Sequence, residues 1–190
     1  MTQTRRQGVE GSKKRDIFID AAETILRSEG YIGISSQNVA DKAGLTKQLL
    51  YYYFRTMDDL ILALVRRVNE RRLVRFEDAL ASSEPLKMLW SLNNDPASAT
   101  LATELTAIAG HRDAIRTEII HSAQRFRALQ VRAVSELLIK RGKASHSAAG
   151  IVMIATAIAR TINSEASLGL TEGHAEALAI VEQMLGQLSI

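Results

Sequence analysis

The sequence predicts an all-α fold of about nine helices, and three observations lead to this prediction. Apolar residues recur at intervals of three and four along nearly the whole 190-residue chain, which is the spacing of one helix face. The alternation of apolar and polar residues that marks a half-buried strand is almost absent. Both prolines, Pro85 and Pro96, stand where a helix can begin. A chain of this length can bury a sizeable core without disulfides or metal ions.

Four helices are expected in the front part of the chain, each with a capping residue before it or a glycine after it. Ser35 and Thr46 can accept hydrogen bonds from the free N–H groups of the helices that follow them. Thr56 precedes Asp59 by three residues, which is a capping arrangement. Gly30 fits the carboxyl end of the first helix. The expected bounds are about 13–29, 36–44, 47–53 and 57–81, and residues 1–12 are expected to form a basic, flexible arm.

Five more helices are expected behind the SSEP stretch at 82–85. Gly142 and Gly169 stand just past two of the expected helix ends. The helix from 146 to 168 is apolar nearly all round, so other helices must cover it on both sides. The expected bounds are about 85–93, 96–109, 112–141, 146–168 and 172–188.

The stretch AGLTKQLLYYYF at 43–54 has the pattern of a helix-turn-helix, in which a tight turn with glycine sets one short helix across another. Successive helical residues are rotated by about 100°, so three consecutive tyrosines cannot share one face. With Leu50 and Phe54 turned toward the core, Gln48 and Tyr52 point directly away from it. The tyrosines therefore have different surroundings and different uses.

This division of faces suits a helix that lies in the major groove of DNA. Gln48 can bond to an adenine edge, and Tyr52 can contact a thymine methyl group. Lys47, Tyr51 and Tyr53 on the flanks can donate to phosphates. A helix-turn-helix also occurs as plain packing in proteins that bind no DNA, so its geometry alone leaves both interpretations open. Residues 1–78 hold 14 Lys and Arg against 11 Asp and Glu, a modest excess that is compatible with phosphate contact.

Several functional classes are excluded or disfavoured by residue types that the chain lacks. It contains no cysteine, which excludes disulfides, thiolate zinc sites and cysteine nucleophiles. The four histidines are scattered without a metal-ligand spacing, so neither a metal nor a cofactor is expected. No Gly-x-Ser-x-Gly and no glycine-rich phosphate loop occur, which disfavours an enzyme. No apolar run approaches the ~20 residues of a membrane span, so no membrane association and a cytoplasmic location are expected.

Five stretches of the front part, in order and with matching spacing, resemble the DNA-binding domain of TetR/AcrR-family transcriptional regulators. They are DIFIDAA at 16–22, EGY at 29–31, VADKAGLTK at 39–47, LYYYF at 50–54 and DDL at 58–60. Three positions depart from the family pattern. Tyr53 stands where the family often has His, Leu49 stands where a small or polar residue is common, and Met57 stands where Lys is frequent.

The resemblance implies an N-terminal three-helix helix-turn-helix DNA-binding domain followed by a helical ligand-binding and dimerisation domain. The corresponding ranges are 13–56 for the DNA-binding domain, 57–81 for a linking helix and 82–190 for the second domain. It also implies that the start of the second helix approaches one DNA strand and that the third helix makes most other contacts. The DNA-binding residues expected are Lys14, Arg15, Ser35, Ser36, Gln37, Thr46, Lys47, Gln48, Tyr51, Tyr52 and Tyr53.

For the second domain the resemblance implies a small-molecule pocket and a dimer interface. The pocket is expected to involve Met88, Leu92, Leu101, Leu105, Ile108, Phe126, Gln130, Met153 and Thr156. The dimer interface is expected on the last two helices, at Ile158, Ile162, Leu178, Val181 and Leu185. Stripes of apolar residues at this spacing also fit an ordinary helical core, so that alternative stays open.

The expected function is that of a homodimeric repressor, released from palindromic double-stranded DNA by a small, mainly hydrophobic effector. The alternative is a DNA-binding architectural or constitutive regulator whose second domain only dimerises. Buried polar groups without partners around a cavity would favour the first, and a solid core would favour the second.

Overall fold

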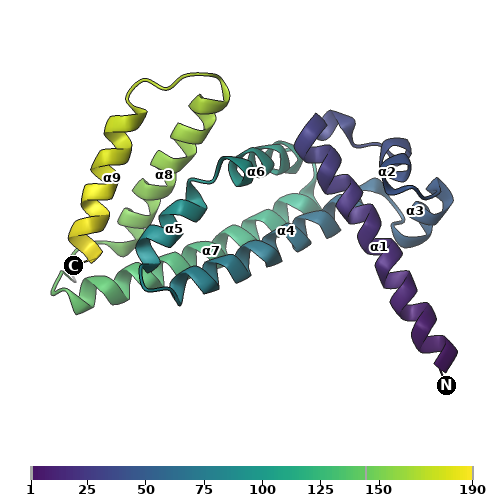
Figure 1. Ribbon diagram of the computed structural model, residues 1–190, viewed down its shortest axis with the longest axis horizontal. Coiled ribbons are helices and arrows are strands. Elements are labelled where there is room, and N and C mark those ends of the chain that lie inside the picture. The colour runs from purple at the N-terminus through teal and green to yellow at the C-terminus, as the bar shows by residue number, and fades with distance from the viewer. Residues whose placement is uncertain (1, 144, 190) are drawn as a thin grey trace. The chain divides into compact units, whose positions relative to one another are not determined.

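The computed structural model describes residues 2–143 and 145–189, with side chains from 13 to 143 and from 145 to 187. Within these ranges the chain forms nine α-helices, one short 3-10 helix and no strand, so the predicted all-α class is confirmed (Figure 1). None of the helices described there is long and apolar enough to cross a membrane. The elements are α1 (Thr2–Glu29), η1 (Tyr31–Gly33), α2 (Ser36–Ala43), α3 (Lys47–Tyr53), α4 (Met57–Leu80), α5 (Pro85–Asn93), α6 (Pro96–Ala109), α7 (Asp113–Lys140), α8 (Ala148–Ser167) and α9 (His174–Ser189).

Most helix boundaries follow the capping residues. α2 and α3 begin directly after Ser35 and Thr46, as expected. α8 begins at Ala148 and not at 146, because the hydroxyl of Ser147 accepts a hydrogen bond from the Gly150 N–H at 3.1 Å. α1 begins at Thr2 and not near residue 13, so this helix continues into the range that the sequence suggests for an arm.

The chain divides into two compact units that do not follow the order of the sequence. Unit 1 holds Met1–Asn69 and Thr103–Ile119, and unit 2 holds Glu70–Ala102 and Ile120–Ile190. The helices α4, α6 and α7 therefore contribute one part to each unit. The functional ranges 13–56, 57–81 and 82–190 stay a prediction, and residues 103–119 belong to the same compact unit as the helix-turn-helix.

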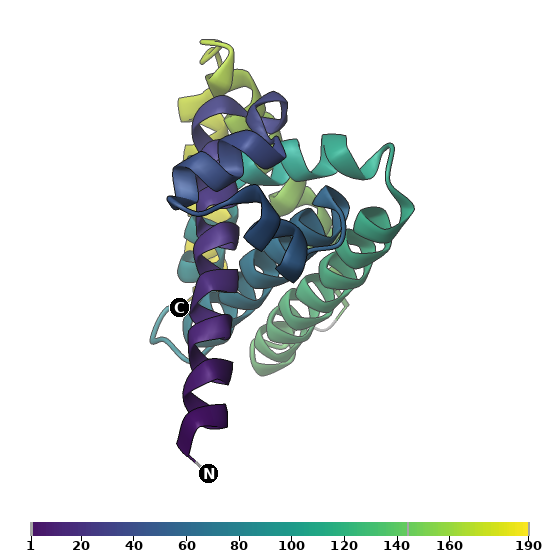
Figure 2. The same ribbon diagram turned by 90° about the vertical axis from the view of Figure 1, so that its right-hand side faces the viewer.

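The core of unit 1 joins α1, α2, α3 and the start of α4 to the corner between α6 and α7. α1 packs against both short helices of the helix-turn-helix (Figure 2). Phe18 on α1, Leu50 on α3 and Leu64 on α4 are fully buried, as is Ile115 on α7. Burial of each such side chain contributes about 1.5–3 kcal/mol, so this packing holds α3 in one orientation.

Unit 2 contains two clusters of buried apolar residues. One joins α4, α5 and α7 and consists of Phe76, Ala79, Leu89 and Phe126. The other joins α5, α7 and α8 and consists of Leu86, Val134, Leu138, Ala148 and Val152. α8 and α9 lie side by side, and both pack against α5 (Figure 1).

Candidate nucleic-acid interface

The turn between α2 and α3 is held by one glycine and two caps. Gly44 ends α2 with a φ of 64°, a left-handed conformation that disfavours a side chain. The hydroxyl of Ser35 accepts a hydrogen bond from the Asn38 N–H at 3.1 Å, and the hydroxyl of Thr46 accepts one from the Leu49 N–H at 3.3 Å. Both hydroxyls use an acceptor position for the cap, so their protons stay available for a phosphate oxygen.

α3 turns one polar face to solvent. Leu50 and Phe54 are buried, whereas Gln48 is exposed and Tyr52 is 78 % exposed. This is the rotation predicted from the sequence, because 48 and 52 lie one turn apart on the side opposite 50 and 54. Gln48 and Tyr52 therefore form one exposed strip along α3, which we call the α3 strip.

Tyr53 has different surroundings from the two tyrosines before it. It is half-buried, and its ring centroid lies 6.4 Å from that of the buried Phe18. The same ring meets Tyr52 edge to face, with 5.0 Å between centroids. Aromatic pairs of this kind contribute about 0.5–1.5 kcal/mol beyond their burial. Tyr53 thus connects the most exposed ring of α3 to the core, while its role as a phosphate donor stays a prediction.

Basic side chains lie before, on and after α3. Lys47 in the first turn of α3 is exposed. Tyr51, one turn later on the same flank of the helix, is exposed as well. Arg15 on α1 lies with its Cζ 5.0 Å from the ring centroid of Phe54, a cation–π distance, while Lys14 beside it is half-buried. Arg55, two residues after the end of α3, is exposed and is missing from the predicted DNA-binding residues. A lone arginine immediately behind the LYYYF stretch is the signal that could have identified it.

The start of α2 is less open than the α3 strip. Ser35 and Ser36 are half-buried, and Gln37 is exposed. The Nε2 of Gln37 donates to both carboxylate oxygens of Asp41, at 2.7 and 2.9 Å. A phosphate contact through this amide nitrogen therefore requires the pair to open first.

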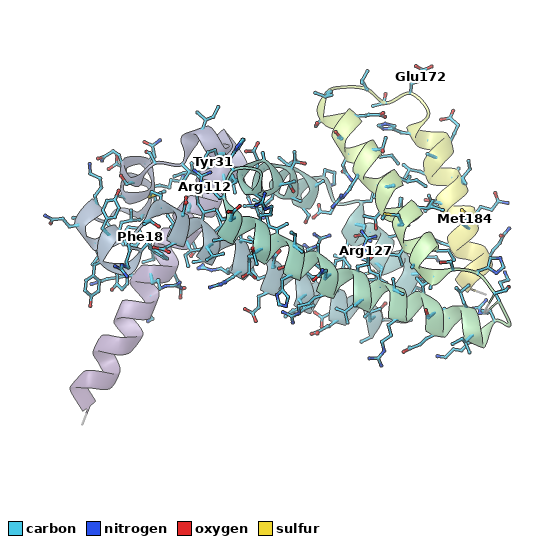
Figure 3. The ribbon with its side chains drawn as sticks, turned by 180° about the vertical axis from the view of Figure 1, so that it is seen from behind. Phe18, Tyr31, Arg112, Arg127, Glu172 and Met184 are labelled. Atoms are coloured by element: carbon cyan, nitrogen blue, oxygen red, sulfur yellow. The ribbon has the colours of Figure 1, made fainter. Side chains whose placement is uncertain are left out.

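The corner between α6 and α7 is bound to the rest of unit 1 through Arg112. Its Nε donates to Asp58 Oδ1 at 2.7 Å, its Nη2 donates to the Tyr31 hydroxyl, and its Cζ lies 4.9 Å from the Tyr31 ring centroid (Figure 3). Partial burial lowers the pKa of Arg112, but the hydrogen bond to Asp58 and the contact with Tyr31 outweigh it, so the pKa is raised. The Tyr31 N–H donates to Glu104 Oε2 at 2.9 Å. Residues 103–119 thus brace both the end of α1 and the start of α4.

The residues predicted to line a pocket are divided between the units. Leu105 and Ile108 are buried in unit 1. The others belong to unit 2, and they are Met88, Leu92, Leu101, Phe126, Gln130, Met153 and Thr156. The structure therefore assigns the predicted set to two separate cores.

Two of the unit 2 candidates are exposed and two are polar. Met88 and Met153 are both about half exposed, at 46 % and 53 %. Thr156 donates to the backbone carbonyl of Val152 at 2.7 Å, so its hydroxyl has a partner within α8. Gln130 is only 7 % exposed, and it leaves no buried polar atom without a partner in the described part of the chain. Neither polar candidate is therefore a buried unsatisfied group.

The residues predicted for the dimer interface are largely covered within the chain. Val181 is 5 % exposed, and Leu185 packs against the cluster that contains Leu86. Half-buried are Ile158, Ile162 and Leu178. The exposed apolar side chains of α8 and α9 include Ile154, Ile180 and Met184 instead. When apolar residues lie on almost every side of a helix, the sequence pattern cannot tell which of them face outward, and the predicted dimer interface stays a prediction.

The front part of the chain matches a known family. Residues 18–64 match the model of bacterial regulatory proteins of the tetR family. The HTH-type transcriptional regulator PksA of Bacillus subtilis (strain 168) is 30 % identical over 70 residues. That stretch is 37 % of this chain and spans only about a third, 34 %, of the length of PksA.

Solved structures resemble the chain over almost its whole length. A TetR transcription regulator from Haloarcula marismortui ATCC 43049 has a TM-score of 0.75 at 20 % identity, covering 94 % of this chain and 97 % of its own. GusR of Salmonella enterica has a TM-score of 0.71 at 18 % identity, with coverage of 93 % and 95 %. A protein from Saccharomonospora viridis, solved in complex with choline, has a TM-score of 0.74 at 16 % identity, with coverage of 93 % and 94 %.

At these identities the structural likeness shows the fold alone, and the specific sequence signal lies in residues 18–64. The matched residues run from the buried Phe18 through the two capped helices to the buried Leu64. They include Gly44 and the whole α3 strip. Residues 18–64 therefore form a helix-turn-helix DNA-binding domain that matches the tetR family of bacterial regulatory proteins, and the chain has the fold of solved TetR regulators.

Proposed function

We propose that the chain is a homodimeric transcriptional repressor that binds an inverted-repeat DNA site through α3. A small, mainly hydrophobic effector binds unit 2 and releases the protein from DNA. The observation that carries the DNA-binding part is the α3 strip, in which exposed Gln48 and Tyr52 are backed by buried Leu50 and Phe54. A rigid support of this kind keeps the base-reading side chains in place.

Sequence reading is assigned to the α3 strip. The Gln48 amide can bond an adenine edge through two hydrogen bonds, which discriminates against a wrong base by about 1–3 kcal/mol. Tyr52 contacts a thymine methyl group with its ring. Because Tyr53 packs edge to face against it, the Tyr52 ring loses little freedom when it binds.

Phosphate contacts surround that strip. The hydroxyls of Ser35 and Thr46 donate from the starts of α2 and α3, and Lys47, Arg15 and Arg55 supply positive charge. These contacts set the register of the protein on the duplex without reading bases. Each neutralised phosphate steepens the salt dependence of binding by roughly one unit in a log–log plot.

Dimerisation is assigned to the outer faces of α8 and α9. Ile154 on α8 and Ile180 and Met184 on α9 are about half exposed to solvent in the single chain, at 45–57 %. A two-fold contact between copies covers this surface with the same residues of the partner. Two reading helices related by that axis then require an inverted-repeat DNA site.

Effector binding is assigned to unit 2. The Saccharomonospora viridis protein of the same fold was solved with choline, which supports a small-molecule site in this architecture. In this chain α4, α6 and α7 run from unit 2 into unit 1, so a change in unit 2 has a covalent route to the α3 strip. The effector acts only if it prefers the released arrangement, by a few kcal/mol.

The alternative is a constitutive or architectural regulator whose unit 2 only dimerises. Satisfied polar groups support it: Thr156 bonds within α8, and the Asn163 Nδ2 donates to the Ala159 carbonyl at 2.8 Å and to Asn94 Oδ1 at 3.2 Å. The buried Nε of Arg72 in unit 2, which has no acceptor among the described residues, supports the effector-responsive version. A screen in which no small molecule changes DNA affinity would select the alternative.

The test of the proposed function is selection of bound DNA from a random duplex pool at physiological salt. We expect an inverted repeat to be recovered, with a conserved base where Gln48 contacts it. Recovery of only weak, salt-sensitive binding without sequence preference contradicts the proposal. The double variant Gln48→Ala, Tyr52→Ala is the control, since it keeps the fold and removes the reading groups.

A further inference from the structure

One half-buried arginine of unit 2 has a buried donor without an acceptor among the described residues. Arg72 on α4 lies between two aromatic rings, with its Cζ 5.3 Å from the Phe76 centroid and 4.9 Å from the Phe126 centroid. Its Nε is buried and has no acceptor within the described part of the chain. A buried donor without a partner destabilises the folded chain, and more so when the group is charged. The rings provide cation–π attraction but leave the N–H unsatisfied.

Like charges surround this group. Burial lowers the pKa of Arg72, and the positive charges of Arg160 and Arg75 lower it further. Arg75 has one carboxylate partner, Asp95, at the long distance of 3.9 Å between Nη1 and Oδ2. Arg160 on α8 is exposed and makes no ion pair with any residue that the structure describes. The cluster of Arg72, Arg75 and Arg160, here called the arginine cluster, therefore has more positive charge than its carboxylate partner neutralises.

A second polar side chain lies near the aromatic pair. Gln130 is one helical turn after Phe126 on α7, so both residues belong to the same face of that helix. It is only 7 % exposed, but it leaves no buried polar atom without a partner in the described part of the chain, in contrast to Arg72. The buried Nε of Arg72 is therefore the donor that indicates a missing polar ligand, and Gln130 adds an amide on the neighbouring helix face.

We propose that the effector is an organic carboxylate, bound with its head group on Arg72 and its apolar body against Phe76 and Phe126. The planar guanidinium fork matches a carboxylate through parallel N–H···O bonds, and Gln130 supplies a further amide donor. Arg75 and Arg160 are exposed, so they attract an anion from solvent toward the buried group. As the effector of a repressor this ligand rests on the proposed function, whereas its binding to the arginine cluster does not.

The carboxylate also explains how binding changes unit 2. Without an anion, the like charges on α4 and α8 repel each other across the cluster. A bound carboxylate replaces this repulsion with attraction and gives the Arg72 Nε an acceptor. The ligand therefore draws α4 and α8 together around the aromatic pair, and it stabilises the folded chain by mass action.

The experiment uses the full chain without DNA and two carboxylate probes, benzoate and decanoate. Each has a neutral counterpart of similar shape, benzyl alcohol and decanol. Thermal unfolding and isothermal titration calorimetry measure binding. We expect at least one carboxylate to raise the unfolding temperature and to bind at least about tenfold more tightly than its alcohol, because each ion-paired hydrogen bond contributes about 1.5–3 kcal/mol.

Variants assign the binding to the arginine cluster. Arg72→Met is expected to remove the preference for carboxylate over alcohol, and Gln130→Leu to weaken it by a smaller factor. Arg72→Lys keeps the charge but loses the planar fork, so it is expected to reduce carboxylate affinity and provides the answer if Arg72→Met does not fold. Arg132→Met is the matched control, since Arg132 is an exposed arginine of unit 2 paired with Glu136 at 2.9 Å. It is expected to bind like the wild type.

Three results would overturn the inference: neither carboxylate binds, the alcohols bind equally well, or a folded Arg72 variant binds carboxylate as tightly as the wild type. Failure of the proposed function has a different signature. If an inverted repeat is selected but carboxylates do not bind, the proposed DNA-binding function is supported and the proposed class of effector is wrong. If carboxylates bind through Arg72 but no DNA sequence is selected, the proposed carboxylate site is supported and the proposed function as a transcriptional regulator is wrong.

Discussion

Units 1 and 2 each place an arginine against an aromatic ring, but only one of these arginines has its donors satisfied. In unit 1, Arg112 lies over Tyr31 and donates both to that tyrosine's hydroxyl and to Asp58. In unit 2, Arg72 lies between two phenylalanine rings, with like charges near it and no acceptor for its buried Nε in the described ranges. Both arginines contact aromatic rings, but only Arg112 also has hydrogen-bond acceptors within its own unit.

The difference indicates where each unit binds a partner from outside. Unit 1 satisfies the inward-facing Arg112 with its own residues and leaves the free polar groups on the α3 strip, where a large surface such as DNA can reach them. Unit 2 leaves the buried Nε of Arg72 without an acceptor among the described residues, and we propose that a small molecule supplies that acceptor. Exposed polar groups on a helix therefore suit a large partner such as DNA, whereas a buried donor without an acceptor suits a small effector.

The largest expected effect is on dimerisation through the outer surface of unit 2, where apolar side chains are exposed in the single chain. Ile180→Glu places a charge on the exposed apolar face of α9 and is expected to convert a dimer to monomers. By symmetry two isoleucine burials are lost, each about 1.5–3 kcal/mol. Sedimentation equilibrium measures the change. Val74→Glu, at an exposed valine of α4, is the control and should remain dimeric; a wild type that is monomeric contradicts this interface.

The α3 strip gives the next largest effect. Gln48→Ala is expected to weaken binding to the selected DNA by about 1–3 kcal/mol and to relax the preference at one base position, because one bidentate contact is lost. Binding to random DNA should be unchanged, as measured by fluorescence anisotropy with both duplexes. Gln124→Ala, an exposed glutamine on α7, serves as the control. An equal loss for all sequences would mean that Gln48 does not read a base.

Arg112 of unit 1, whose guanidinium has hydrogen-bond partners within the chain, is expected to contribute to the stability of the fold. Arg112→Met removes the hydrogen bonds to Asp58 and Tyr31 and leaves those groups without their partner, so we expect a loss of about 2 kcal/mol in the free energy of unfolding. Urea unfolding followed by circular dichroism measures this loss. If the variant is as stable as the wild type, the corner between α6 and α7 is not held by this contact.

The unsatisfied arginine of unit 2 is expected to show the smallest effect on the stability of the ligand-free chain. Arg72→Met replaces a buried charge that lacks an acceptor by an apolar side chain of similar length, so the free energy of unfolding should change by less than about 1 kcal/mol. The same urea experiment compares it with Arg112→Met and with the exposed Arg132→Met. A loss as large as that of Arg112→Met would break the comparison, because Arg72 would then have a structural role.

The rotation of α3 could be predicted from the sequence, whereas those of α8 and α9 could not. With Leu50 turned toward the core, Phe54 at the end of α3 follows on the same side, and the structure buries both. On α9 the pattern favours Val181 as an interface residue, but Val181 is buried in the chain and its neighbour Ile180 is exposed. Where apolar residues occupy most positions of a helix, the period alone cannot identify the outer face.

The arginine cluster and the composition of unit 1 depend on contacts between distant residues. Arg72 appears in the sequence as one of several charges on a long helix, and nothing in a single sequence places Phe126 against it. Likewise Leu105 and Ile108 have the pattern of any apolar helix face, although they belong to the compact unit of the helix-turn-helix. The local sequence pattern predicts the helices and their caps. Contacts between residues that are distant in the sequence can be seen only in the three-dimensional structure.

Residues 103–119 complete unit 1, and this determines when the unit can form during protein synthesis. A growing chain that has emerged only to residue 69 lacks Ile115 for the core, Glu104 for the Tyr31 N–H and Arg112 for Asp58. The DNA-binding unit therefore reaches its stable form only after residue 119 has left the ribosome, when the front of unit 2 has also emerged. A product of premature termination within α4 or α5 would accordingly be a substrate for proteases and not a competitor for the DNA site.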